Sequence, residues 1–294
     1  MHTNNKNLPP PLCAVIDKFT SEHAKGMGDA DISVTQLIDS PCIRILRMRN
    51  QGKIVTDYSE HLWAVYGSIA GYIMEHSGIA KGNLAELRVT HEVLGMKLKG
   101  SIDFLMEDGY LDDYKLTSGY TIQDGGRAEW VAQLNIYRYF MRHENNVELQ
   151  DMEKRCKGLR IVAMARDWGP RMKEDLPTPV TIIKIPDWTD EQTRLYIEGR
   201  INVHKAAMAL PEPPVCSDEE RWAQPTVFAV MKKGNKTSSR NLPTRIEAES
   251  WMAQTGKGDC IVERPGVYTR CENYCDLSAC GLCPYYKRKE VSNG

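Results

Sequence analysis

The sequence predicts an α/β fold with one larger domain and a small C-terminal appendage, on two observations. The first is size and composition: 294 residues, of which 41% are hydrophobic and 26% charged, suit a globular chain of one large domain with an appendage or of two modest domains. Collagen, a coiled coil and wholesale disorder are excluded. The second is the order of hydrophobic patterns, which predicts a helix, three antiparallel strands, a helix and further strands.

The larger domain is expected over residues 31–210, after a flexible leader over residues 1–30. A first helical pattern runs from Leu37 to Met48. Small residues among apolar ones predict a closely packed helix over residues 63–75. Three strands separated by turns at Gly95 and Gly109 are then expected, at residues 87–94, 97–105 and 110–116.

The second half of this domain begins with an amphipathic helix over residues 130–143, where apolar residues recur every three or four positions. Strands are expected over residues 159–166 and 180–185. A long helix should follow over residues 189–210, capped by Thr189 or Asp190. Prolines from Pro211 onward end it.

Residues 211–294 form the expected C-terminal extension. Strands are predicted over residues 226–231 and 260–264, around a helix over residues 244–253. Thr244 and Glu247 at the start of that helix have the spacing of a capping box. A cysteine-rich segment ends the extension.

Charge and hydropathy limit the partners and the location. The chain has 38 Lys and Arg against 39 Asp and Glu, a net charge of -1, so a polyanion would have to meet a local basic patch. The polar N-terminus is unlike a signal peptide. The uncharged stretch over residues 62–74 is 13 residues long, short of the roughly 20 of a membrane-spanning helix. We expect a cytoplasmic protein with no membrane partner and, without a P-loop, no ATPase motor.

The candidate chemistry lies in the hairpin around residues 99–115. If residues 107–109 form a three-residue loop with Gly109 left-handed, Met106 pairs with Tyr110 and Asp103 lies opposite Asp113. A two-residue turn would shift the register by one and move Asp103 to the other face.

Two facing carboxylates favour a bound cation. Like charges a few ångströms apart repel unless something positive lies between them, and oxygen ligands select Mg²⁺ or Mn²⁺. Lys115 shares the face of Asp113, because side chains alternate along a strand. It could orient a metal-activated water and offset charge on a phosphate. The alternative for an isolated D-x-K tripeptide is a surface salt bridge.

Three motifs occur in order: G-x-I-D ending at Asp103, L-x-D-Y-K-x-T around Asp113 and Lys115, and Q-L-x-I-Y from Gln133 to Tyr137. Together they resemble the RecB-like and phage-type exonuclease branch of the PD-(D/E)XK nuclease superfamily, over residues 35–210. The resemblance implies a restriction-endonuclease-like αβββαβ core and a metal-dependent DNA nuclease.

The resemblance also implies roles for individual residues. Asp103 and Asp113 would hold the metal, Lys115 would serve the nucleophilic water, and Gln133 with Tyr137 would support Lys115 or the DNA backbone. An additional acid of the family corresponds to Glu86, with Glu92 as the rival. The family commonly carries a metal-binding histidine where this chain has Gly71, so the site would bind one metal less tightly or use another carboxylate.

The nine cysteines do not suggest a secreted disulfide framework, because their number is odd and they are thinly scattered before the last segment. Dense thiols in a reducing compartment usually bind zinc or an iron-sulfur cluster. Relatives in the branch often carry a [4Fe-4S] cluster with one cysteine ligand before the core, and Cys42 resembles that ligand. Cys216 lies in a stretch that resembles phage-type relatives, which makes it another candidate ligand. The candidate ligands are Cys271, Cys275, Cys280, Cys283, Cys216 and Cys42, of which at least two must be spectators.

A basic segment is the candidate DNA contact. No acidic residue occurs from Trp222 to Ile246, and the stretch reads as a hairpin tip that contacts phosphates. A solvated surface loop is the alternative. The expected DNA-binding residues are Lys232, Lys233, Lys236 and Arg240.

The sequence therefore predicts a Mg²⁺- or Mn²⁺-dependent deoxyribonuclease, an exonuclease of phage or mobile-element recombination or repair. DNA is its expected partner, with a recombination or single-strand-binding protein as a candidate second one. A trimming or nicking endonuclease is the alternative within the superfamily. The alternative from another class is a non-catalytic DNA-binding protein with a degenerate nuclease core and a structural metal cluster.

Overall fold

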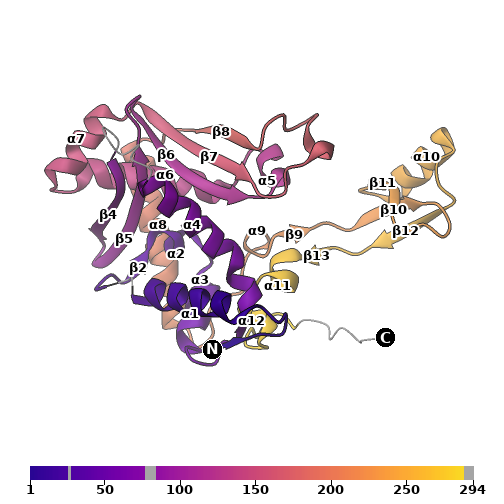
Figure 1. Ribbon diagram of the computed structural model, residues 1–294. Helices are drawn as coiled ribbons and strands as arrows, with labels where there is room; N and C mark the ends of the chain where they lie inside the picture. The colour runs from indigo at the N-terminus through magenta and orange to yellow at the C-terminus, as the bar shows by residue number, and fades with distance from the viewer. Residues whose placement is uncertain (26–27, 77–83, 288–294) are drawn as a thin grey trace. The chain divides into compact units, whose positions relative to one another are not determined.

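The computed structural model describes residues 1–25, 28–76 and 84–287 (Figure 1). The chain divides into two compact units. The first unit comprises residues 1–44 and 55–213, and the second comprises residues 45–54 and 214–294.

The first unit is built on a mixed six-stranded sheet. Its order is β2-β5-β6-β7-β8, with β4 paired to β5. Strands β4, β5 and β6 form antiparallel hairpins, β6 and β7 are parallel, and β7 and β8 are antiparallel. The strands are β2 (Ile32–Ser33), β4 (Leu84–Val93), β5 (Met96–Leu105), β6 (Tyr110–Thr117), β7 (Gly158–Ala165) and β8 (Val180–Ile185).

The β5–β6 hairpin has the register that the three-residue loop predicts. Phe104 pairs with Asp112 and Leu105 with Leu111. The amide of Met106 donates to the carbonyl of Tyr110 over 2.9 Å. Gly109 closes the loop at a φ of 86°, a left-handed conformation that glycine adopts at no steric cost.

The parallel β6–β7 connection requires a crossover, which α5 (Gly119–Gln123), α6 (Ala128–His143) and α7 (Val147–Arg155) provide. Helix α6 packs on β4, β5 and β7, and it contacts α2 (Val34–Ile38) and α8 (Asp190–Ala209). Its buried face, which includes Leu134 and Phe140, belongs to the main hydrophobic core.

The single helix expected from Leu37 to Met48 is instead two, α2 and α3 (Pro41–Arg49). Contacts from a distant part of the chain occupy the carbonyls at the end of α2. The Arg200 guanidinium donates to the carbonyls of Leu37, Ile38 and Asp39, and His204 is hydrogen-bonded to the Leu37 carbonyl over 3.0 Å. These contacts satisfy the carbonyls at the end of α2, so that helix ends there.

Other elements of the first unit surround this core. Helix α4 (Leu62–His76) contacts β6. The segment expected to be a flexible leader contains α1 (Pro10–Lys25), in which Ile16 is fully buried. The remaining elements are β1 (His2–Thr3), β3 (Thr56–Asp57), η1 (Tyr58–His61) and η2 (Pro170–Met172).

The second unit contains a three-stranded antiparallel sheet of order β11-β10-β12, on which α10 packs. Thr244 and Glu247 form the predicted capping box at the start of α10. These elements are β10 (Val227–Met231), β11 (Ser238–Leu242), α10 (Arg245–Thr255) and β12 (Cys260–Arg264).

The cysteine-rich end of the second unit has its own two-stranded sheet. Strands β9 and β13 pair there, and the Arg47 guanidinium binds both carboxylate oxygens of Asp276 over 3.0 to 3.2 Å. The elements are α9 (Asp218–Arg221), β9 (Ala223–Gln224), β13 (Val267–Tyr268), α11 (Thr269–Asn273) and α12 (Asp276–Ala279).

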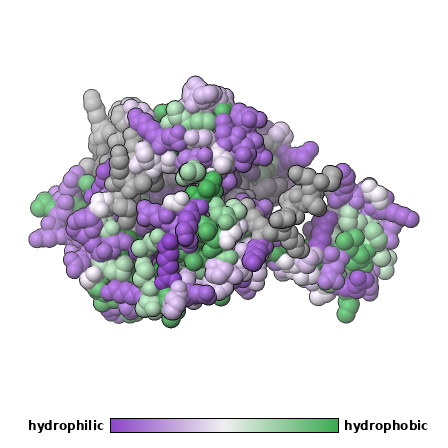
Figure 2. Space-filling model, turned by 90° about the horizontal axis from the view of Figure 1, so that it is seen from below, coloured by the Kyte–Doolittle hydropathy of each residue, from purple (hydrophilic) through white to green (hydrophobic). Residues whose placement is uncertain are grey.

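Hydrophilic and hydrophobic residues are interspersed on the face shown in Figure 2. Within the described residues, none of the helices combines the length and apolarity that crossing a bilayer demands.

Candidate active site

The candidate site lies where β5 and β6 diverge. β5 pairs with β2 at Leu98 and Lys99 and with β6 at Phe104 and Leu105. Extending the β5–β6 register by one position places Asp103 opposite Asp113. At that position the link between the two strands is made by a side chain. Asp103 Oδ2 accepts a hydrogen bond from the Tyr114 amide over 3.2 Å.

Asp113 is the most constrained charge of the site. The residue is 1% exposed, and among the described residues neither of its carboxylate oxygens has a hydrogen-bond partner. Lys115 Nζ lies 2.7 Å from Asp113 Oδ2, an ion-pair contact that lacks hydrogen-bond alignment. Burial raises the pKa of Asp113, and the Lys115 charge opposes that rise. Lys115 therefore neutralises Asp113 from the side of Oδ2, while Oδ1 is buried with no hydrogen-bond donor among the described residues.

Lys115 is held by a side-chain relay from α6. Its ammonium donates to Gln133 Oε1 over 3.1 Å, and Gln133 Nε2 donates to the Tyr137 hydroxyl over 3.0 Å. Burial raises the pKa of Tyr137 well above its usual range, against the hydrogen bonds from Gln133 and from the Ser101 backbone. The tyrosine therefore stays neutral, and the relay fixes where the ammonium points.

Gly100 sets the position of the Tyr137 ring. A Cβ atom at Gly100 would lie 2.5 Å from Tyr137 Cε1 and 3.3 Å from Val34 Cγ2. Tyr137 is itself 4% exposed, so its ring has little room to retreat. Glycine at this position lets α6 approach β5 closely enough for Gln133 to reach Lys115.

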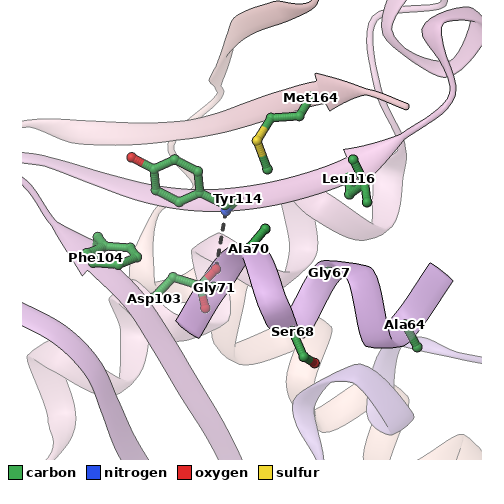
Figure 3. A pocket seen from close by; sticks show the side chains of 10 residues that line it. All are labelled: Ala64, Gly67, Ser68, Ala70, Gly71, Asp103, Phe104, Tyr114, Leu116 and Met164. Carbon is green, nitrogen blue, oxygen red and sulfur yellow. Dashed lines mark hydrogen bonds between the residues drawn. The ribbon is translucent and has the colours of Figure 1, made fainter. Parts of the chain in front are cut away.

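A pocket of about 250 Å³ opens beside Asp103 (Figure 3). One wall is α4, whose small side chains face the sheet, and the other is formed by β5, β6 and β7. The lining residues are Ala64, Gly67, Ser68, Ala70, Gly71, Asp103, Phe104, Tyr114, Leu116 and Met164. Asp103 is the only charged residue among them, and Figure 3 shows its carboxylate directed at the Tyr114 amide.

Gly71, where the resemblance leads one to expect a histidine, lines this pocket and has no side chain to supply a ligand. Glu86 lies in β4 between Ala85 and Leu87, which pair with Phe104 and Ile102. That register brings position 86 beside Asp103, but the Glu86 side chain lies outside the described residues. Its rival Glu92 is exposed and pairs with Lys97.

On the opposite side of β6, Asp112 is neutralised. It is 3% exposed, and Arg160 donates to both its oxygens over 2.6 and 2.8 Å. Burial raises the pKa of Asp112 and Arg160 opposes the rise, while Asp112 raises the pKa of Arg160. The two short hydrogen bonds favour the charged pair. The sequence offered no sign of Arg160, which lies on the next strand of the sheet.

Four cysteines of the second unit interact electrostatically. Burial raises the pKa of the Cys271 thiol, and the neighbouring Cys275, Cys216 and Cys283 raise it further. Cys271 and Cys275 are buried, whereas Cys280 and Cys283 are half-buried. Cys42 is buried in the first unit. Over the described part of the chain, no three His, Cys, Asp or Glu side chains are arranged as a metal site.

The predicted DNA-binding residues lie on a β10–β11 hairpin, as the sequence indicates. Lys232, Lys233 and Lys236 are exposed in its turn. Arg240 is exposed on β11, with its guanidinium 5.8 Å from the centre of the Trp251 ring.

Among the solved structures to which this chain is similar are two distant ones. The protein SSO0001 aligns at 15% identity with a TM-score of 0.46, covering 64% of this chain and 84% of its own. A chain described as "Putative exonuclease" from Eubacterium rectale aligns at 17% identity with a TM-score of 0.32, covering 64% of each chain. No family model and no curated protein matches the sequence.

Proposed function

We propose that the chain is a divalent-cation-dependent deoxyribonuclease that hydrolyses phosphodiester bonds with Asp103, Asp113 and Lys115. The observation that carries the proposal is the buried Asp113 carboxylate, whose oxygens have no hydrogen-bond partner among the described residues. Lys115 contacts only Oδ2, and leaving the other buried carboxylate oxygen unsatisfied is costly unless a further cation binds it. Asp103 on the facing strand offers a second oxygen ligand, a donor set that suits Mg²⁺ or Mn²⁺.

The bound cation would lower the pKa of a water molecule and polarise a phosphate oxygen. Lys115 is placed to act on that chemistry, because its ammonium contacts Asp113 and is oriented by Gln133. It would direct the attacking water and stabilise negative charge building on the phosphate oxygens. Tyr137 acts through Gln133 as a positioning residue.

Other parts of the proposal rest on the resemblance and on charge. The αβββαβ core, the exonuclease activity in recombination or repair and Glu86 as a third acid follow the PD-(D/E)XK resemblance. Lys232, Lys233, Lys236 and Arg240 would bind DNA phosphates, because they are exposed and lie close together in the sequence.

For the second metal, we propose that Cys216, Cys271, Cys275 and Cys283 form the ligand set. The support is that Cys275, Cys216 and Cys283 each raise the pKa of the Cys271 thiol. Their thiols would have to move together to hold zinc or a [4Fe-4S] cluster. Elemental analysis and a visible absorption spectrum would identify the metal, and Cys216→Ser should release it whereas Cys280→Ser should not.

The test of the proposed function is an assay on linear and circular, single-stranded and duplex DNA, with Mg²⁺ or Mn²⁺ and with a chelator. We expect cation-dependent degradation by the wild-type protein and none by Asp113→Asn. Cleavage retained by Asp113→Asn would overturn the site. DNA binding with no cleavage under either cation would favour the non-catalytic DNA-binding protein instead.

A further inference from the structure

The pocket beside Asp103 has an aromatic and cationic rim. Trp63 immediately precedes the lining residue Ala64 on α4, and Arg166 follows the lining residue Met164 by two positions after β7. The Arg166 guanidinium lies 4.6 Å from the centre of the Trp63 ring. In Figure 3, Ala64 and Asp103 lie toward opposite ends of the pocket, so this pair marks the end away from the carboxylate.

Both members of the pair remain open to a ligand. Trp63 is 52% exposed although it is a large apolar side chain. Arg166 is exposed and forms no ion pair with any carboxylate of the described chain. Its backbone amide donates to the Thr117 carbonyl over 2.8 Å, so the residue is anchored to the end of β6. A fixed indole face beside a free guanidinium suits a flat ring attached to an anion.

The length of the pocket corresponds to a short stretch of a single strand. A pocket of about 250 Å³ is smaller than the roughly 300 to 1,000 Å³ that hold drug-sized ligands. Gly71 lies seven positions after Ala64 on α4, a helical rise of about 10 Å. That length corresponds to about three nucleotides at roughly 3.4 Å each along a strand.

We propose that Trp63 and Arg166 form a stacking platform for an unpaired base, in the strand whose phosphate reaches Asp103. Trp63 would take the base on its exposed ring face, and Arg166 would bind the adjoining phosphate. The inference rests on the proposed function, and it makes unpaired nucleotides next to the cut a requirement of the substrate. The two residues are specificity determinants, because they touch the nucleotide and not the reacting phosphate.

The experiment measures binding separately from cleavage. Asp113→Asn protein with Ca²⁺ is titrated with oligothymidylate and with a blunt duplex, each carrying a fluorescent label. Adding Trp63→Ala should weaken oligothymidylate binding about 5- to 100-fold, the range for losing one stacked base, and should leave duplex binding nearly unchanged. Trp63→Phe should recover most of the affinity.

The matched control is Tyr120→Ala, which removes an aromatic side chain that is 66% exposed in the same unit and does not line the pocket. Arg166→Ala should weaken oligothymidylate binding and lower its dependence on salt, since one phosphate contact is lost. Equal affinity of Trp63→Ala and its Trp63 parent for oligothymidylate would overturn the platform, even if wild-type protein degrades DNA. Trp63-dependent binding by a protein that never cleaves would overturn the proposed function while leaving the platform in place.

Discussion

Asp112 and Asp113 are neighbours on β6, are almost equally buried at 3% and 1% exposure, and differ in their partners. Asp112 receives two short hydrogen bonds from Arg160, whereas Asp113 has one ion-pair contact with Lys115 and oxygens without hydrogen-bond partners among the described residues. Burial costs both carboxylates a similar loss of hydration. Arg160 compensates that loss at both oxygens of Asp112, whereas Lys115 contacts only one oxygen of Asp113. We therefore assign a structural role to Asp112 and cation binding to Asp113.

The largest effect should come from replacing Lys115, whose ammonium contacts the buried Asp113. Lys115→Ala removes the group that orients water and offsets phosphate charge, and we expect DNA hydrolysis to fall about 10²- to 10⁴-fold. The measurement is the single-turnover rate with Mg²⁺, alongside the circular dichroism spectrum. The control Lys154→Ala removes an exposed lysine that pairs with Asp151 on α7 and should leave the rate unchanged. A Lys115→Ala protein with the wild-type rate would contradict the role.

Removing Asp112, whose charge Arg160 neutralises, should affect the stability of the protein instead of its activity. Asp112→Ala leaves the Arg160 guanidinium, which is 14% exposed, with Asp108 as its remaining carboxylate partner. We expect the free energy of unfolding in urea to fall by about 3 kcal/mol. Asp108→Ala, which removes the more exposed partner, should cost less. A cost at Asp108 as large as that at Asp112 would show that burial does not distinguish the two contacts.

Gly100→Ala tests whether the relay behind Lys115 depends on the close approach of α6. The added methyl group must displace the Tyr137 ring, and we expect a loss of about 1 to 3 kcal/mol in stability together with a lower rate constant for hydrolysis. The control is Gly199→Ala on α8, where nothing lies within 4 Å of the added Cβ. It should stabilise the helix by up to about 1 kcal/mol. If Gly100→Ala has wild-type stability and rate, the contact does not set the site.

The smallest expected effect is that of Asp113→Asn on the melting temperature of the metal-free protein. The pKa of Asp113 is raised in the folded state, so the folded protein holds that proton more tightly than the unfolded chain. The favourable contribution is present at low pH and is lost as the pH rises from the usual value of about 4 through the raised pKa. Asp113→Asn should therefore melt at a higher temperature than wild type at neutral pH with a chelator present.

Mg²⁺ should reverse the order of the two melting temperatures. Mg²⁺ should raise the melting temperature of the wild-type protein and leave that of Asp113→Asn unchanged, because a ligand that binds only the folded state stabilises it. Differential scanning calorimetry with and without Mg²⁺ measures both effects. An equal shift in the two proteins would place the cation elsewhere.

The hairpin that carries the acids could be predicted from sequence because its geometry is local. A three-residue loop ending in a left-handed glycine fixes the register, and the register fixes which side chains face each other. The structure adds a reason for Gly109 beyond its φ, since a Cβ there would lie 2.6 Å from the Arg155 carbonyl oxygen. The Gln133–Tyr137 pair was also predictable, because its spacing lies within one helix.

Contacts between distant parts of the chain could not be predicted. Pro41, which begins α3, marks the break after α2 locally, but the carbonyls at the end of α2 bond to Arg200 and His204, more than 160 residues later in the sequence. The pairing of Asp112 with Arg160, and of Trp63 with Arg166, likewise depends on how separate elements pack. One sequence contains no pattern that joins such positions. The roles of the cysteines, of Glu86 and of the basic hairpin stay predictions.

The central claim is that Asp113 is buried with one oxygen unsatisfied because it binds a divalent cation. Electron paramagnetic resonance of Mn²⁺ titrated into the wild-type protein, Asp113→Asn and Asp151→Asn tests it without DNA or turnover. We predict a bound Mn²⁺ in the wild-type protein and in Asp151→Asn, which changes an exposed carboxylate on α7, and loss of that site in Asp113→Asn. Mn²⁺ bound equally well by Asp113→Asn would contradict the account.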